Sequence, residues 1–122
     1  MSMTFTTDLA AVRARVSRCA REAGLSDARI IDLVLAAGEI TANTVRHTHS
    51  AGTLDVWHDA SEIVCEVKDK GFIRDPLAGT RRPAADALHG HGLWLVRRLC
   101  DRVEIRSDET GSTIRLHMFL GK

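Results

Sequence analysis

The stretch Glu39-Ile-Thr-Ala-Asn43-Thr-Val-Arg-His47 says more about the fold than any other part of this chain. It lies in a run of apolar residues at helical spacing, so Glu39 and Asn43 rise from the same side of a predicted helix. A carboxylate in this position can act as a general base or orient a hydroxyl. An amide oxygen there can complete the oxygen shell of a magnesium ion that phosphates already bind. Alone, such a pair is more often part of a solvated helix face.

Two further motifs follow in order. Asp69-Lys-Gly71 ends a predicted buried strand. A carboxylate there can accept a hydrogen bond from the exocyclic amine of adenine, and Gly71 would let the backbone approach the ring closely. Gly90-His-Gly92-Leu93 opens a predicted helix, where backbone amides can point at phosphate oxygens. Each motif alone fits an ordinary turn or helix start, but together their order and spacing suit a site for ATP and magnesium.

Three more polar residues are candidates for this site. His47 follows Asn43 by one turn and is expected near phosphates or in a local hydrogen bond. Ser112 and Thr113 can reach the base through a hydroxyl or a water, and equally fit an ordinary strand. The six histidines have no second cluster of ligands at zinc-site spacing, and the sequence contains neither a Walker phosphate loop nor a strand followed by Gly-x-Gly-x-x-Gly.

The hydrophobic pattern predicts one domain over residues 1–122, with the order β-α-α-β-β-loop-α-β-β. The predicted elements are a short edge strand at 3–7, helices at 8–23 and 26–47, strands at 54–58 and 63–67, a long loop at 72–91, a helix at 92–100, and strands at 103–107 and 112–120. Strands in hairpins give a mostly antiparallel sheet, so we expect an α/β protein, a two-layer α/β sandwich with its helices on one face.

Two side-chain placements follow from this pattern. The second helix is expected to face the core with a stripe at 3-and-4 spacing, made of Ile31, Val34, Leu35, Gly38, Ala42 and Val45. Trp57 lies on the strand face opposite Leu54 and Val56. It is therefore either part of a protein interface or a partly covered edge residue.

Composition narrows the classes of function. At 122 residues, 44% hydrophobic and 27% charged, the chain is an ordinary globular domain. A formal charge of +1 and 4% aromatic residues argue against nucleic acid or an anionic membrane as the main partner. Cys19, Cys65 and Cys100 form neither a disulfide framework nor a metal motif, and are expected to be small buried residues. Without a signal peptide or an apolar span, we expect a soluble, cytoplasmic protein.

These motifs in this order resemble the GHKL superfamily of ATP-binding domains, and more closely the serine-kinase anti-sigma factors of bacteria. Glu39-x-x-x-Asn43-x-x-x-His47 is similar to the N box of that family, Asp69-x-Gly71 to its first glycine box, and Gly90-x-Gly92-Leu93 to its second. The resemblance covers about residues 8 to 120. It implies a Bergerat-type ATP-binding fold.

The resemblance also implies roles. Glu39 would be the catalytic base, Asn43 the magnesium ligand and Asp69 the residue that reads adenine, while the remaining nucleotide contacts would be His47, Gly71, Gly90, Gly92, Leu93, Ser112 and Thr113. Residues 72–91 would be the ATP lid. Members of the family bind a sigma factor in one state and phosphorylate a serine of a STAS-type anti-anti-sigma protein in another. The family likeness further suggests a homodimer.

Two departures from the family pattern leave alternatives open. Ile73 stands where the first glycine box usually has its second glycine, and Gly38 precedes Glu39 where a polar residue is expected. Glycine inside a helix costs about 1 kcal/mol relative to alanine, so we interpret Gly38 as relieving crowding near the site. The alternatives to a kinase are a non-catalytic interaction module gated by nucleotide, motivated by Ile73, and a histidine-kinase catalytic domain detached from its receptor.

Overall fold

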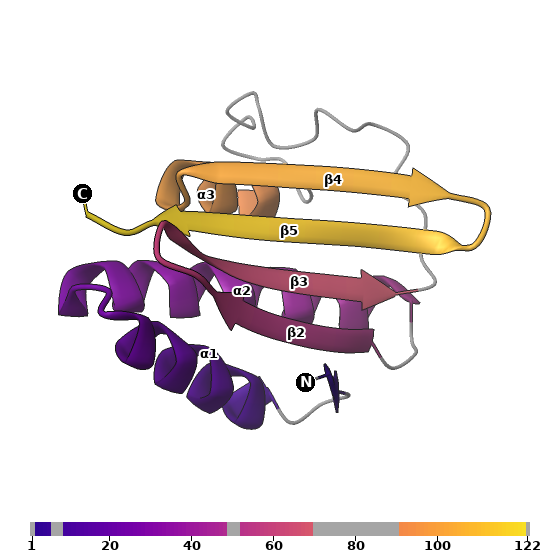
Figure 1. Ribbon diagram of the computed structural model, residues 1–122. Helices are drawn as coiled ribbons and strands as arrows, with labels where there is room; N and C mark the ends of the chain where they lie inside the picture. The colour runs from indigo at the N-terminus through magenta and orange to yellow at the C-terminus, as the bar shows by residue number, and fades with distance from the viewer. Residues whose placement is uncertain (1, 6–8, 49–51, 70–90, 122) are drawn as a thin grey trace.

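The computed structural model describes residues 2–5, 9–48, 52–69 and 91–121, and its element order is the predicted one (Figure 1). The elements are β1 (Ser2–Phe5), α1 (Leu9–Ala23), α2 (Asp27–Thr48), β2 (Gly52–His58), β3 (Glu62–Asp69), α3 (His91–Leu99), β4 (Arg102–Asp108) and β5 (Gly111–Phe119). The loop expected at 72–91 lies outside the described residues except for its last residue, which begins α3. Of the described helices, none is long and apolar enough to cross a membrane.

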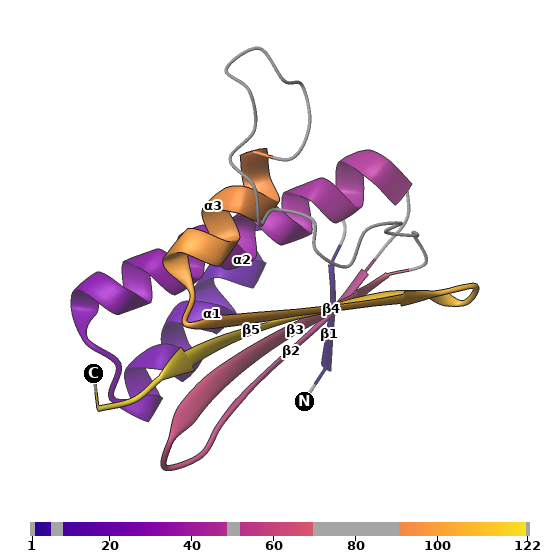
Figure 2. The same ribbon diagram turned by 90° about the horizontal axis from the view of Figure 1, so that it is seen from above.

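The five strands form one sheet in the order β1-β2-β3-β5-β4, and every neighbouring pair is antiparallel. All three helices lie on the same side of this sheet (Figure 2). The prediction of a two-layer α/β sandwich is therefore confirmed. Its first strand is the edge strand that the sequence predicted, although it spans Ser2–Phe5.

The connection between α1 and α2 has well-defined caps. Gly24 ends α1 with a φ of 88°, a left-handed conformation that suits glycine. Its amide donates to the Arg21 carbonyl at 3.1 Å, and the Leu25 amide donates to the Ala20 carbonyl at 3.1 Å. These two bonds form a Schellman motif. Ser26 then caps α2, because its Oγ accepts the Arg29 amide at 3.4 Å.

Side-chain alternation along the strands places the core between the two layers. The sheet contributes its inward-facing apolar residues, namely Leu54, Val56, Ile63, Cys65, Val67, Ile114, Leu116 and Met118. From the helices, the largest fully buried side chains of the core are Val12, Val16, Leu33, Ile40 and Val96. Burial raises the pKa of the Cys100 thiol to about 12 and raises that of Cys65 as well. Cys65 and Cys100 are therefore small buried hydrophobes, as we expected, whereas Cys19 is only partly buried.

The orientation of α2 differs from the prediction. Ile31 is 67% exposed and Leu35 is 46% exposed, so neither faces the core. The buried row is offset by one residue and consists of Ile30, Leu33, Ala36, Ala37, Ile40, Thr41 and Thr44. The sequence of α2 contains two apolar rows at helical spacing, and periodicity alone does not say which one packs on the sheet. Its C-terminal half lies beside the end of β3 (Figure 1).

Candidate functional site

The carboxylate of Asp69 joins the helical layer to the sheet. Thr44 Oγ1 lies 3.0 Å from Asp69 Oδ2, and Ser112 Oγ lies 3.0 Å from Asp69 Oδ1. The three side chains come from α2, β3 and β5. Each oxygen of the carboxylate is thus paired with a different hydroxyl, which fixes the plane of the group at the end of β3.

The local sequence explains why these three side chains meet. Asp69 and Ser112 are register partners in the antiparallel pair of β3 and β5. Strand alternation then turns both side chains toward the helices, as it does for Val67 two residues earlier. Thr44 is 4% exposed on the sheet-facing side of α2, and its hydroxyl also lies 3.0 Å from the Ile40 carbonyl. Because a hydroxyl has one proton, Thr44 divides its donation between these two acceptors.

Glu39 and Asn43 occupy successive turns of α2 just before the contact between Thr44 and Asp69. Both residues are partly exposed, whereas Ile40 and Thr44 beside them are buried. Asn43 is the residue immediately before Thr44, so the bond from Thr44 to Asp69 sets the position of this turn against the end of β3. His47 lies one turn further along α2, and its side chain is outside the described part of the structure.

The structure describes only some of the residues of the two glycine motifs that are predicted to contact the nucleotide. Gly71 and Gly90 lie outside the described residues, as does Ile73. Gly92 and Leu93 lie in the first turn of α3, and Leu93 packs partly buried against the core. The expected role of this turn in holding phosphates stays a prediction.

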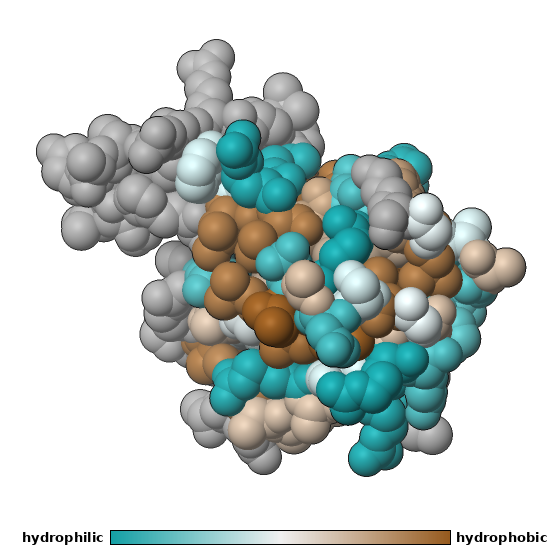
Figure 3. Space-filling model, turned by 90° about the vertical axis from the view of Figure 1, so that its left-hand side faces the viewer, coloured by the Kyte–Doolittle hydropathy of each residue, from teal (hydrophilic) through white to brown (hydrophobic). Residues whose placement is uncertain are grey.

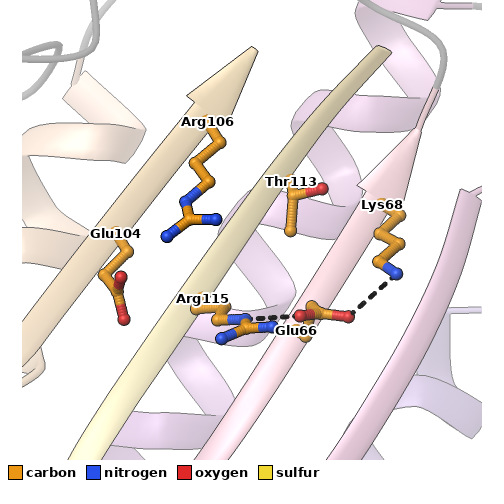
Figure 4. Close-up of a pocket in the computed structure, with 6 residues that line it drawn as sticks. All are labelled: Glu66, Lys68, Glu104, Arg106, Thr113 and Arg115. Atoms are coloured by element: carbon orange, nitrogen blue, oxygen red, sulfur yellow. Dashed lines mark hydrogen bonds and ion pairs between the residues drawn. The ribbon is translucent and has the colours of Figure 1, made fainter. Parts of the chain in front are cut away.

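Thr113 lies apart from the other candidates. It lines a hollow of about 210 Å³ on the sheet face away from the helices, together with Glu66, Lys68, Glu104, Arg106 and Arg115 (Figure 4). Ser112, its neighbour in sequence, contacts Asp69 on the helical side. The structure therefore brings Ser112 to Asp69 and separates Thr113 from it.

Charges on this outer sheet face pair mainly with one another. Glu66 receives the Arg115 Nε at 2.5 Å and lies 3.4 Å from the Lys68 ammonium. Its hydrogen bond raises the pKa of Arg115. His117 contacts Glu62 through Nδ1 at 3.1 Å and Glu104 through Nε2 at 2.6 Å. These pairs link side chains of β3, β4 and β5 on that face of the sheet.

Thr44 is the site residue that sequence reasoning missed. It continues the buried row that contains Leu33, Ala37 and Ile40 at spacings of four, three and four residues. A polar side chain in a mostly apolar buried row needs a partner, and Thr41, the other threonine of the row, bonds to the Ala37 carbonyl of its own helix. That irregularity is the signal in the sequence that could have pointed to Thr44, once the buried row of α2 was known.

The donor chemistry of the described residues is compatible with magnesium. Among residues 2–5, 9–48, 52–69 and 91–121, no group of three or more His, Cys, Asp or Glu side chains is placed to hold a metal. Magnesium usually binds through one or two protein oxygens plus substrate phosphates and waters, so it needs no such group. Asn43 offers a single amide oxygen of this kind on a partly exposed turn.

Known proteins share this architecture. The chain matches the family described as the histidine kinase-like ATPase domain over residues 4–118. The serine-protein kinase RsbW of Halalkalibacterium halodurans is 29% identical over an alignment of 122 residues, which covers 89% of this chain and 74% of that protein. A crystal structure of the RsbU and RsbW domains of a Mycobacterium tuberculosis protein superposes with a TM-score of 0.64 at 19% identity.

That superposition covers 97% of this chain and 32% of the Mycobacterium tuberculosis chain, and it bears on the fold alone. The family match extends over nearly the whole chain, including all five strands and all three helices in whole or in part. The predicted GHKL-type resemblance is confirmed. This chain belongs to the histidine kinase-like ATPase domain family.

Proposed function

We propose that this protein is an ATP-dependent protein-serine kinase and anti-sigma factor. It phosphorylates a STAS-type anti-anti-sigma protein in one state and sequesters a sigma factor in the other. The observation that carries the proposal is the Asp69 carboxylate, held by Thr44 and Ser112 beside the turn of α2 that contains Asn43. The family match and the similarity to a protein named serine-protein kinase RsbW support it.

In this proposal Asp69 selects adenine. A carboxylate oxygen can accept more than one hydrogen bond, so a donor can approach Asp69 in addition to the hydroxyls of Thr44 and Ser112. Asp69 therefore suits the exocyclic amine of adenine, which is a donor, and disfavours the carbonyl that guanine has at the same position. Ser112 takes part through its bond to Asp69, with Gly71 beside the ring. His47, Gly90, Gly92 and Leu93 are assigned to the phosphates.

Phosphoryl transfer would occur at the partly exposed turn of α2. Asn43 would be the protein ligand of the magnesium ion, which neutralises charge on the phosphates when bound. Glu39 would accept the proton of the acceptor serine as the serine oxygen bonds to the γ-phosphorus and the bond to ADP breaks. The site would act in the cytoplasm, on protein partners and without direct contact to nucleic acid or membrane.

Calorimetric titration of ATP with magnesium tests the nucleotide site. Wild type should bind, and Asn43→Asp and Asp69→Asn should each lose binding, while thermal melts show that both variants fold. Transfer to a STAS-type protein should form acid-stable phosphoserine and should disappear in Glu39→Ala. ATP binding without any transfer would instead favour the nucleotide-gated interaction module. Acid-labile phosphate on a partner histidine would favour the detached histidine-kinase domain.

A further inference from the structure

The solvent-facing side of α2 carries an apolar row that the core does not use. Of the large hydrophobic side chains in the described residues, three are exposed, and two of them, Ile31 and Leu35, lie one turn apart on this helix. The outward side of a surface helix is ordinarily polar. Here the outward row contains Ile31, Leu35 and the small residues Ala28, Gly38 and Ala42. We call these five residues the outer stripe.

The core of the protein does not explain the outer stripe. The sheet is already covered by the other row of α2, which includes the fully buried Leu33 and Ile40. Figure 3 looks onto the end of the molecule where α2 begins, and hydrophobic side chains gather near the middle of that surface. An apolar row left in solvent beside a complete core is typical of a surface that contacts another protein.

The position of Glu39 indicates what that protein is. Glu39 lies one turn beyond Leu35 and two turns beyond Ile31, so about 6 Å and 12 Å along the helix axis. Any protein that brings a hydroxyl to Glu39 must rest on the surface around it. On α2 that surface is the outer stripe, where Gly38 and Ala42 flank Glu39 and present little side chain. A Cβ placed on Gly38 would meet no described atom within 4 Å.

We infer that the outer stripe is the docking surface for the protein that carries the phosphoacceptor serine, an inference that rests on the proposed kinase function. Ile31 and Leu35 supply the apolar contact, and Glu39 receives the acceptor hydroxyl at the end of the row. The surface area that two exposed side chains and three small ones can bury is well below the roughly 800 Å² that each partner buries in a standard stable interface. A contact of this size suits a substrate that must dissociate after each transfer.

The test measures phosphate transfer by the full-length chain while the concentration of its partner varies. The probe is a STAS-type anti-anti-sigma protein encoded in the same genome. Ile31→Lys and Leu35→Lys should each raise the KM for this protein by about tenfold. The kcat and the Kd for ATP should stay within about twofold of wild type, because only binding of the partner has changed. Both residues are exposed, so the melting temperature should be nearly unchanged.

Trp57→Lys is the matched control. Trp57 is also a large, exposed hydrophobic side chain, 41% exposed, but it lies on the other face of the sheet, where Arg115 stacks 5.7 Å from its ring centre. Its KM should equal that of wild type. Leu35→Met should likewise keep the wild-type KM, because it retains the apolar contact.

Three outcomes would overturn the inference, and they can be told apart. An unchanged KM in both lysine variants would overturn the docking surface and leave the kinase intact. A wild-type protein that binds ATP but transfers to no STAS-type protein would overturn the proposed function and the partner named here together. Light scattering that finds a wild-type dimer, converted by Leu35→Lys to monomers with unchanged KM, would assign the stripe to a second copy of this chain.

Discussion

Thr44 on α2 and Asp69 at the end of β3 are joined by a hydrogen bond, with Oγ1 and Oδ2 3.0 Å apart. This is the contact that links the helix carrying Asn43 to the carboxylate expected to read adenine. Thr44 is buried, at 4% exposure, whereas Asp69 is only partly buried, so the bond is sheltered from water mainly on the side of Thr44. The precise direction of the Asp69 carboxylate therefore depends on a residue that need not touch the nucleotide.

Thr44→Val should weaken ATP binding by about tenfold, because a hydrogen bond to a charged group is lost and Asp69 can rotate. Valine keeps the shape of threonine, so packing is preserved. Discrimination between ATP and GTP should fall in parallel, since the orientation of Asp69 sets it. Calorimetry with both nucleotides measures these quantities. Thr44→Ser, which keeps the hydroxyl, should bind as wild type does, and equal losses in the two variants would contradict a positioning role.

Leu33→Ala and Leu35→Ala should differ sharply in stability, although the two residues are near neighbours on α2. Leu33 is fully buried, so Leu33→Ala should lower the free energy of unfolding by about 2–5 kcal/mol. Leu35 is 46% exposed, so Leu35→Ala should lower the free energy of unfolding by less than about 1 kcal/mol. Urea denaturation of the two variants measures the difference. Similar losses would mean that α2 packs as the sequence pattern suggested, with Leu35 toward the core.

The strands and helices could be predicted because each has one dominant period. Ile114, Leu116 and Met118 alternate with the polar residues Thr113, Arg115 and His117, which is enough to place β5 in a half-buried sheet. The rotation of α2 could not be predicted, since rows through Ile31 and through Leu33 both have helical spacing. Asn43 and Asp69 were found from motifs in the sequence. Thr44 was missed because its partner Asp69 lies 25 residues away, and only the packing of α2 on the sheet brings them together.

Acid should remove a stabilising contribution from Glu104. The hydrogen bond from His117 holds the pKa of Glu104 below its ordinary value of about 4.3, and Arg102 adds to this. Because this carboxyl has a lower pKa in the folded protein than in the unfolded chain, its ionised form stabilises the fold. That contribution is complete at pH values above the unfolded-state pKa, and it is lost as the pH falls through the folded-state pKa. Glu104→Gln should therefore lower the melting temperature at pH 6, and its difference from wild type should shrink below about pH 4.

Glu109→Gln provides the comparison for that pH series, because Glu109 is exposed in the turn between β4 and β5. Its melting temperature should follow wild type at every pH. A Glu104→Gln difference that stays constant down to pH 3 would show that the lost charge does not act through the bond to His117.

Gly38→Ala should stabilise the protein by roughly 1 kcal/mol, or about 4 °C in melting temperature. The sequence suggested that Gly38 relieves crowding, but an added Cβ meets no described atom within 4 Å, so that interpretation is wrong for the described residues. Alanine then gains helix propensity without a clash. Gly24→Ala is the contrasting variant: its φ of 88° disfavours a Cβ, and the substitution should cost about 1 kcal/mol. Thermal melts that showed the same sign for both variants would contradict this assignment.

Ser112→Ala and Thr113→Val separate the two faces of β5. The residues are adjacent, yet Ser112 donates to Asp69 on the helical side while Thr113 lines the charged hollow on the opposite face. Ser112→Ala should weaken ATP binding about fivefold to tenfold, because one of the two hydroxyls that orient Asp69 is removed. Thr113→Val, which preserves strand propensity, should leave the Kd for ATP unchanged.

Combined with Thr44→Val, Ser112→Ala should act non-additively on the Kd for ATP, since both hydroxyls orient one carboxylate. Loss of binding in Thr113→Val instead would mean that the nucleotide is read from the outer face of the sheet.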